Sequence, residues 1–172
     1  MTRQTAASRL RSERGLTLIE TAMSCALMVT VLAGLASLAS VASMYTENEG
    51  HLSARTTEYA QDKLEQLLAL AYTDSVSNTV VFPATPNGGT GLAVGGSITN
   101  PVNGFVDWLG TDGSLLGGGA AAPNGWFYKR LWQITSPTTG LKQVSVMVTV
   151  RSAVGGALLP KSTVVAMKAW QF

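Results

Sequence analysis

Residues 14–20 place a glycine, a short apolar stretch and a carboxylate at the start of a long run without further charge. They read Arg-Gly-Leu-Thr-Leu-Ile-Glu, and the next charged residue after Glu20 is Glu47. A carboxylate inside a membrane segment costs several kcal/mol unless a partner neutralises it. The pattern therefore predicts a segment that leaves the lipid and packs against another protein, where Glu20 meets a positive group.

The stretch Arg14–Glu20 resembles the processing motif of type IV prepilins and type II secretion pseudopilins. In that family a prepilin peptidase cuts after the glycine and methylates the new amino terminus. The resemblance implies a cut between Gly15 and Leu16, methylation of Leu16, and roles in assembly for Thr17 and Glu20. It also implies that Glu20 pairs with the amino terminus of a neighbouring subunit. The family usually has phenylalanine where this chain has Leu16.

A second, weaker similarity indicates a minor component of such a filament. The string Tyr59–Leu67 is similar to the segment that follows the anchor in minor pilins of the PilV type and in pseudopilins of the GspI type. The partners that this resemblance implies are the prepilin peptidase, other pilin or pseudopilin subunits, and the inner-membrane assembly platform.

The charges around the apolar run predict its orientation in a membrane. Residues 1–15 contain four arginines and one glutamate, and positive charge beside an apolar span is held on the cytoplasmic side. As a helix, Leu16–Met44 would be about 43 Å long at ~1.5 Å per residue, more than the ~30 Å hydrocarbon core. We expect a leader at 1–15, a transmembrane and assembly helix at 16–46, and an extracytoplasmic head at 47–172.

Three other interpretations of the apolar run stay open. It resembles a secretory signal peptide cut before Ser43, although signal cores are shorter, at ~7–15 residues. Cys25 would be the acylated residue of a lipoprotein, but the leucine usual three positions earlier is absent. In a plain single-pass anchor, Glu20 would lie at the membrane interface.

The composition favours one small exported head domain. Most of the 172 residues lie beyond the apolar run, enough for one domain with its own core. The net charge of +2 comes from the leader, so nucleic acid is not an expected partner. The only cysteine, Cys25, lies in the apolar run and is expected to be a small packing residue.

The helix is expected to continue beyond the membrane. Gly50 is a weak point, because glycine costs ~1 kcal/mol relative to alanine in a helix interior. From His51 to Tyr72 the sequence predicts an amphipathic helix with an apolar stripe and an acidic stripe. The acids either contact basic residues of adjacent subunits or form a solvated face. The apolar stripe is Ala60, Leu64, Leu67, Leu68 and Ala71, and the acidic stripe is Glu58, Asp62 and Glu65.

Residues 83–125 are rich in glycine and in turn dipeptides such as Asn87-Gly88 and Asp112-Gly113. We expect a long surface loop with one or two short strands. Asp107 and Asp112 raise the question of calcium, but two carboxylates rarely fill a site that needs six to eight oxygens. They are interpreted as turn and capping residues, and no metal is expected.

The last third of the chain predicts an antiparallel sheet. Residues 126–134, 142–150 and 163–170 are β-rich runs separated by turn signals. In the second run every other residue from Val144 to Val150 is valine, which predicts a half-buried strand. Trp126, Tyr128 and Trp132 alternate in the first run and are interpreted as core. The fold class is therefore α+β and pilin-like, with a long N-terminal helix packed on a small antiparallel sheet.

Enzyme chemistry has little support in the sequence. The single histidine, His51, stands near the apolar run beside no candidate nucleophile, and no metal-ligand motif or P-loop appears. The chain is expected to be no enzyme and to need no cofactor. It is interpreted as a minor type IV pilus subunit, with a type II secretion pseudopilin and a tip-located adhesion or DNA-uptake module as alternatives.

That interpretation also predicts where the protein is found. Before assembly the chain would lie in the inner membrane as a single-pass protein with a cytoplasmic N-terminus. After assembly it would belong to an extracytoplasmic or cell-surface filament. Gly34 and neighbouring small residues of the apolar helix would then let other helices approach closely.

Overall fold

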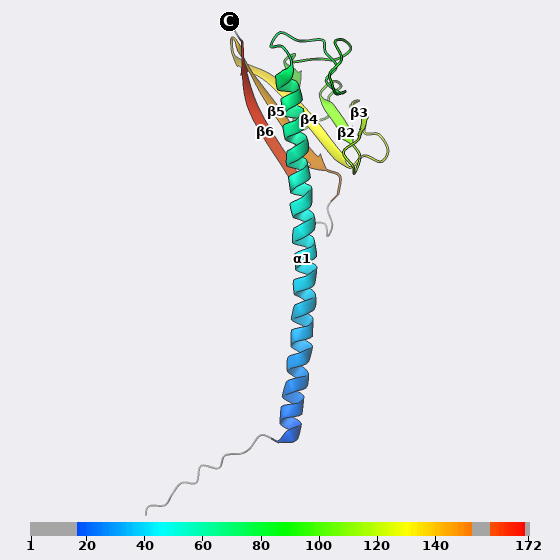
Figure 1. Ribbon diagram of the computed structural model, residues 1–172, viewed down its shortest axis with the longest axis vertical. Coiled ribbons are helices and arrows are strands. Elements are labelled where there is room, and N and C mark those ends of the chain that lie inside the picture. The colour runs from blue at the N-terminus through cyan, green and yellow to red at the C-terminus, as the bar shows by residue number, and fades with distance from the viewer. Residues whose placement is uncertain (1–16, 153–158, 171–172) are drawn as a thin grey trace, which may run out of the picture. The chain divides into compact units, whose positions relative to one another are not determined.

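The computed structural model describes residues 17–152 and 159–170, which form one long helix followed by an antiparallel sheet (Figure 1). The α+β class predicted from the sequence is confirmed. The chain divides into two compact units, one that ends at Ser43 and one that begins at Met44. Gly15 and Leu16, which form the predicted processing site, lie outside the described residues.

Helix α1 runs from Leu18 to Ala69. Thr17 caps its first turn, because the Thr17 hydroxyl oxygen accepts a hydrogen bond of 3.3 Å from the Glu20 backbone N–H. Thr-x-x-Glu is the spacing of a capping box, and an acid in the first turn also suits the helix dipole. The helix continues through Gly50 without a break and ends before the predicted limit at Tyr72.

Within the described residues the sheet contains six strands, and each described pair is antiparallel. The order is β3-β2-β4-β5-β6, and β1 pairs with β4 on the same side as β2. The predicted meander of three long strands is confirmed as β4, β5 and β6. The strands are β1 Gly95–Gly96, β2 Val106–Leu109, β3 Leu115–Gly117, β4 Tyr128–Thr138, β5 Leu141–Val150 and β6 Lys161–Ala169.

The expectation of a surface loop with one or two short strands at 83–125 is confirmed only in part. Three short strands lie there, and every residue of β2 is buried. β2 pairs with the edge of β4 that does not face β5. Val106 lies opposite Leu131, and Leu109 lies opposite Tyr128. Further along the same edge, a Cβ at Gly96 would lie 2.3 Å from the Trp132 carbonyl oxygen. β1 therefore needs glycine to reach β4.

The main core lies between the second half of α1 and one face of the sheet. The alternating valines of β5 are buried as predicted, together with Tyr128 and Trp132 of β4. These two aromatic rings therefore form no exposed binding face. Trp126 does not share their environment, because it packs with Trp108 in a second cluster made by Val106, Trp108 and Leu131. The residues of β4 and β5 that face the main core are Tyr128, Trp132, Ile134, Val144, Val146, Val148 and Val150.

Candidate assembly segment and buried charge cluster

The first half of α1, Leu18–Ser43, is defined here as the assembly segment. Each of its residues is exposed, and apolar side chains occur all around the helix. By length and composition α1 can cross a membrane. An apolar helix without a polar face needs lipid or other apolar helices around it.

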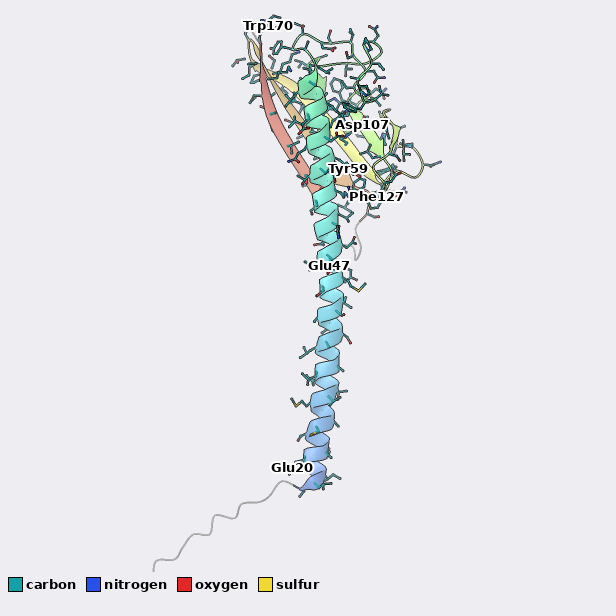
Figure 2. The ribbon with its side chains drawn as sticks, in the orientation of Figure 1. Glu20, Glu47, Tyr59, Asp107, Phe127 and Trp170 are labelled. Atoms are coloured by element: carbon teal, nitrogen blue, oxygen red, sulfur yellow. The ribbon has the colours of Figure 1, made fainter. Side chains whose placement is uncertain are left out.

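The predicted assembly residues Thr17, Glu20 and Gly34 lie along this one helix and do not converge on a pocket. Glu20 is exposed in the first turn, as Figure 2 shows. Within residues 17–152 and 159–170 its carboxylate has no hydrogen bond or ion pair. A Cβ built at Gly34 would meet nothing within 4 Å, so this position is open to a close neighbour.

A cluster of charged side chains is buried in the second unit, between α1 and the sheet. Lys63 of α1 and Asp107 of β2 form an ion pair of 2.8 Å, and both side chains are fully buried. Arg130 of β4 donates to the same Asp107 carboxylate oxygen from Nε at 2.9 Å and from Nη2 at 2.7 Å. One carboxylate oxygen thus joins a helix and two strands through charge-assisted hydrogen bonds.

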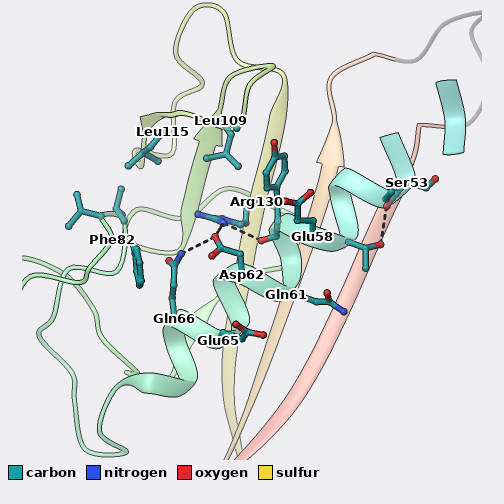
Figure 3. A pocket seen from close by; sticks show the side chains of 16 residues that line it. Ser53, Glu58, Gln61, Asp62, Glu65, Gln66, Phe82, Leu109, Leu115 and Arg130 are labelled. Carbon is teal, nitrogen blue, oxygen red and sulfur yellow. Dashed lines mark hydrogen bonds and ion pairs between the residues drawn. The ribbon is translucent and has the colours of Figure 1, made fainter. Parts of the chain in front are cut away.

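Arg130 also ties the sheet to the exposed side of α1. Its Nη1 donates to the Tyr59 carbonyl oxygen and to the Asp62 carboxylate, each at 3.1 Å. Figure 3 shows these contacts in a groove of about 1130 Å³ beside α1. The predicted acidic stripe is exposed, but Asp62 bonds within the chain and Glu58 pairs with Arg55 at 2.9 Å.

Burial dominates the chemistry of Lys63. Desolvation lowers the pKa of its ammonium group from 10.5 to about 8, although the Asp107 carboxylate acts in the opposite direction. The ammonium group donates to the Thr79 carbonyl oxygen and lies 4.2 Å from the centre of the Trp132 ring. The cluster holds α1, β2 and β4 in one arrangement. Within the described residues, loss of the Asp107 carboxylate would leave Lys63 as a buried cation without a carboxylate and Arg130 with Asp62 alone.

Sequence reasoning missed this cluster. Asp107 was interpreted as a turn or capping residue, and that interpretation is wrong because Asp107 lies on β2 and faces α1. The buried residues of α1 are Thr56, Ala60, Lys63 and Leu67. Only Ala60 and Leu67 of the predicted apolar stripe are fully buried. The buried side of the helix also includes Thr56 and Lys63. A lysine in line with buried alanine and leucine was the signal available in the sequence.

The described residues do not form a metal site. Among residues 17–152 and 159–170, no group of three histidine, cysteine, aspartate or glutamate side chains could hold an ion. Asp112 is a turn residue as predicted, because its carboxylate accepts hydrogen bonds from the Ser114 hydroxyl at 2.7 Å and backbone N–H at 3.0 Å. These bonds lower the pKa of the Asp112 carboxyl, the hydroxyl bond most strongly.

No protein-family model, curated protein or solved structure matches the chain. A long apolar N-terminal helix whose second half packs on an antiparallel sheet is compatible with a pilin-like fold. The assembly segment and the order of the elements are therefore the features on which a function can be argued.

Proposed function

We propose that this chain is a minor subunit of a type IV pilus, processed after Gly15 and assembled through its N-terminal apolar helix. The observation that carries the proposal is the assembly segment. It exposes apolar side chains on all sides, and within the described residues the Glu20 carboxylate has no partner. Such a segment is suited to two environments in turn, first lipid and then a bundle of helices.

The Glu20 carboxylate favours the transfer of the segment from lipid into a bundle of helices. In lipid its charge is costly, whereas a neighbouring subunit could offer the α-amine of its mature Leu16 as a cation. A buried pair of this kind repays desolvation only when its geometry is good. Gly34 would allow the close approach of helix backbones that such geometry requires.

The amino-terminal residue and intact mass of the protein from native-host membranes test the first step. We expect a chain that begins at methylated Leu16. A chain that begins at Ser43 would indicate a secreted domain and would overturn the proposal. An uncut Met1 would leave a membrane-anchored domain and would also overturn it.

A matched pair of variants tests the second step. Glu20→Gln keeps the size and shape of the side chain but removes its charge. We expect normal cleavage and a loss of about tenfold or more in the filament fraction, because breaking a buried ion pair costs more than the ~1.4 kcal/mol that corresponds to tenfold. Glu47→Gln removes a charge at an exposed position beyond the assembly segment (Figure 2) and should leave incorporation unchanged.

The same segment supports a second member of this class of machinery, a type II secretion pseudopilin. The two functions are distinguished by which assembly system, the pilus or the secretion system, depends on the chain. Deletion should abolish surface pili if the chain is a pilus subunit. Loss of protein secretion with intact pili would favour the pseudopilin.

A further inference from the structure

Strand β6 forms one end of the sheet in the described part of the chain. It pairs with β5 along its whole length, from Lys161 opposite Thr149 to Ala169 opposite Leu141, without a register shift. No described strand pairs with its other side. We call that other side of Lys161–Ala169 the open edge.

The hydrogen bonds at the two ends of β6 identify the backbone groups on the open edge. The Trp170 N–H donates to the Gly140 carbonyl, and the Pro160 carbonyl accepts from the Val150 N–H. The even-numbered residues of β6 therefore direct their backbone groups toward β5. Because direction alternates along a strand, the odd-numbered residues direct theirs to the open edge. These residues are Lys161, Thr163, Val165, Met167 and Ala169.

The open edge has few of the features that usually prevent strand addition. Natural edges are protected by proline, bulges, inward-pointing charges or clustered lysines. β6 contains no proline and no bulge, and its side chains at Val165 and Met167 are 53% and 55% exposed. Of its two lysines, Lys168 is engaged elsewhere, because its ammonium group donates to the Leu68 carbonyl oxygen at 2.5 Å.

A hollow of about 680 Å³ lies beside the last part of this edge. It is bounded by Met167–Trp170 and by residues 68–73 at the end of α1. The rings of Tyr72 and Trp170 meet edge to face in this region, with centres 5.1 Å apart. In strand addition, main-chain hydrogen bonds supply affinity and pockets for alternate side chains supply specificity. The open edge and the hollow together provide both elements.

We propose that the open edge of β6 receives an extended segment of a different filament subunit as an additional strand, with one apolar side chain of that segment in the hollow. An extended strand has alternating backbone groups in the spacing that pairs with those of Thr163, Val165 and Met167. The inference rests on the proposed function, because a filament is what brings a second subunit to this edge.

A second copy of β6 paired antiparallel does not fit as the occupant. Ser162, near the start of β6, bonds the Thr56 hydroxyl at 2.9 Å, and Lys168, near its end, bonds Leu68. The second half of α1 and β6 therefore run in the same direction. Antiparallel pairing of two β6 strands would direct the two α1 helices oppositely, whereas subunits that assemble through their N-terminal helices hold those helices parallel.

A proline substitution tests the edge without removing a bond to β5. Val165→Pro eliminates one N–H of the open edge, and proline is accepted on that side of an edge strand. The matched control, Val165→Thr, keeps the β-branched shape and the N–H. In the native host we expect Val165→Pro to lower the filament fraction about tenfold or more, and Val165→Thr to enter filaments like the wild type. Equal incorporation of Val165→Pro and the wild type would overturn the inference.

Amide hydrogen exchange of the wild-type chain provides a test that does not depend on a variant. Exchange at Thr163, Val165 and Met167 should slow at least about tenfold when the chain passes from detergent micelles into filaments. Val164 and Ala166, already bonded to β5, should change little. Equally fast exchange at the odd-numbered positions in both states would overturn the inference and leave the proposed function intact. Absence of the wild-type chain from filaments would overturn the proposed function instead.

Discussion

The two halves of α1 have the same backbone structure and opposite surroundings. In the assembly segment the leucine side chain at Leu27 is 66% exposed, whereas Leu67 in the second half is fully buried. Among the described residues, those buried on α1 all lie beyond Gly50. A cap and suitable residues are enough to make a helix, but a buried face requires a second surface within reach. The second half packs on the sheet, whereas no residue of Leu18–Ser43 is buried.

The largest effect on the free energy of unfolding should follow from removing the Asp107 carboxylate, the anion of the buried cluster beside the second half of α1. Asp107→Asn keeps the shape of the side chain but, among the described residues, leaves Lys63 as a buried cation without a carboxylate and Arg130 with the half-exposed Asp62 alone. We expect the free energy of unfolding of the second unit to fall by about 3–5 kcal/mol. Denaturation of the full chain in micelles, followed by tryptophan fluorescence, measures it, because all four tryptophans lie beyond Met44.

Asp112→Asn is the matched control for that variant. The amide oxygen of the new side chain can still accept the hydrogen bonds from Ser114, and the site is exposed, so stability should stay close to that of the wild type. Similar effects of the two substitutions would mean that the cluster does not hold the second unit together.

A pair of leucine truncations compares the two halves directly. Leu67→Ala removes a fully buried side chain from the main core and should cost about 2–5 kcal/mol. Leu27→Ala removes an exposed side chain in the assembly segment and should leave the same unfolding transition within about 0.5 kcal/mol. A comparable cost for both would show that the assembly segment is packed within the single chain.

Alkaline pH should stabilise the second unit. Because burial lowers the pKa of Lys63 from 10.5 to about 8, the unfolded chain binds more protons between these values. Stability therefore rises with pH, by at most about 1.4 kcal/mol per pH unit. Unfolding measured between pH 8 and 9.5 avoids the titration of Tyr128, whose pKa burial raises.

Lys63→Met is the control for the pH dependence. It removes the group with the largest shift and leaves Asp107 paired with Arg130. Most of the rise between pH 8 and 9.5 should disappear, and burial of Lys142, which also lowers the pKa of that ammonium group, accounts for the remainder. A rise of the same size in this variant would assign the effect to another group.

The smallest effect concerns the two glycines of α1. A Cβ at Gly34 or at Gly50 meets nothing within 4 Å, so alanine at either site should stabilise the isolated helix by about 0.5–1 kcal/mol. Only Gly34→Ala should also reduce the filament fraction, because close helix packing is expected there and not at Gly50. Helix content by circular dichroism and filament yield separate the two results, and equal yields would contradict a packing role for Gly34.

The parts of the fold that were predictable have local causes. The apolar run and the alternating valines of β5 each follow from neighbouring residues, so their pattern is visible along the chain. The helix and the three-stranded meander were predicted for this reason. The burial of β2 was not, because a short strand in a glycine-rich stretch becomes buried only by pairing with β4, which is distant in sequence.

The buried cluster was beyond prediction for a related reason. Lys63, Asp107 and Arg130 are distant in sequence, and each taken alone favours an exposed position. Their burial becomes tolerable only when all three meet, so no single residue signals it. The open edge of β6 could not be predicted for the same reason. The order of the strands in the sheet decides which strand lies at its edge, and that order depends on contacts between distant segments.

The sequence by itself determined that this protein has an apolar helix with one carboxylate near its start, a long strand pattern and no obvious catalytic set. These properties depend on residue type and on spacing within a few turns or a single strand. Only the tertiary structure decided which side of α1 is buried, which charges share one carboxylate oxygen and which strand keeps an open edge. Those outcomes depend on contacts between distant segments, and burial makes such contacts strong enough to override the preferences of the individual residues.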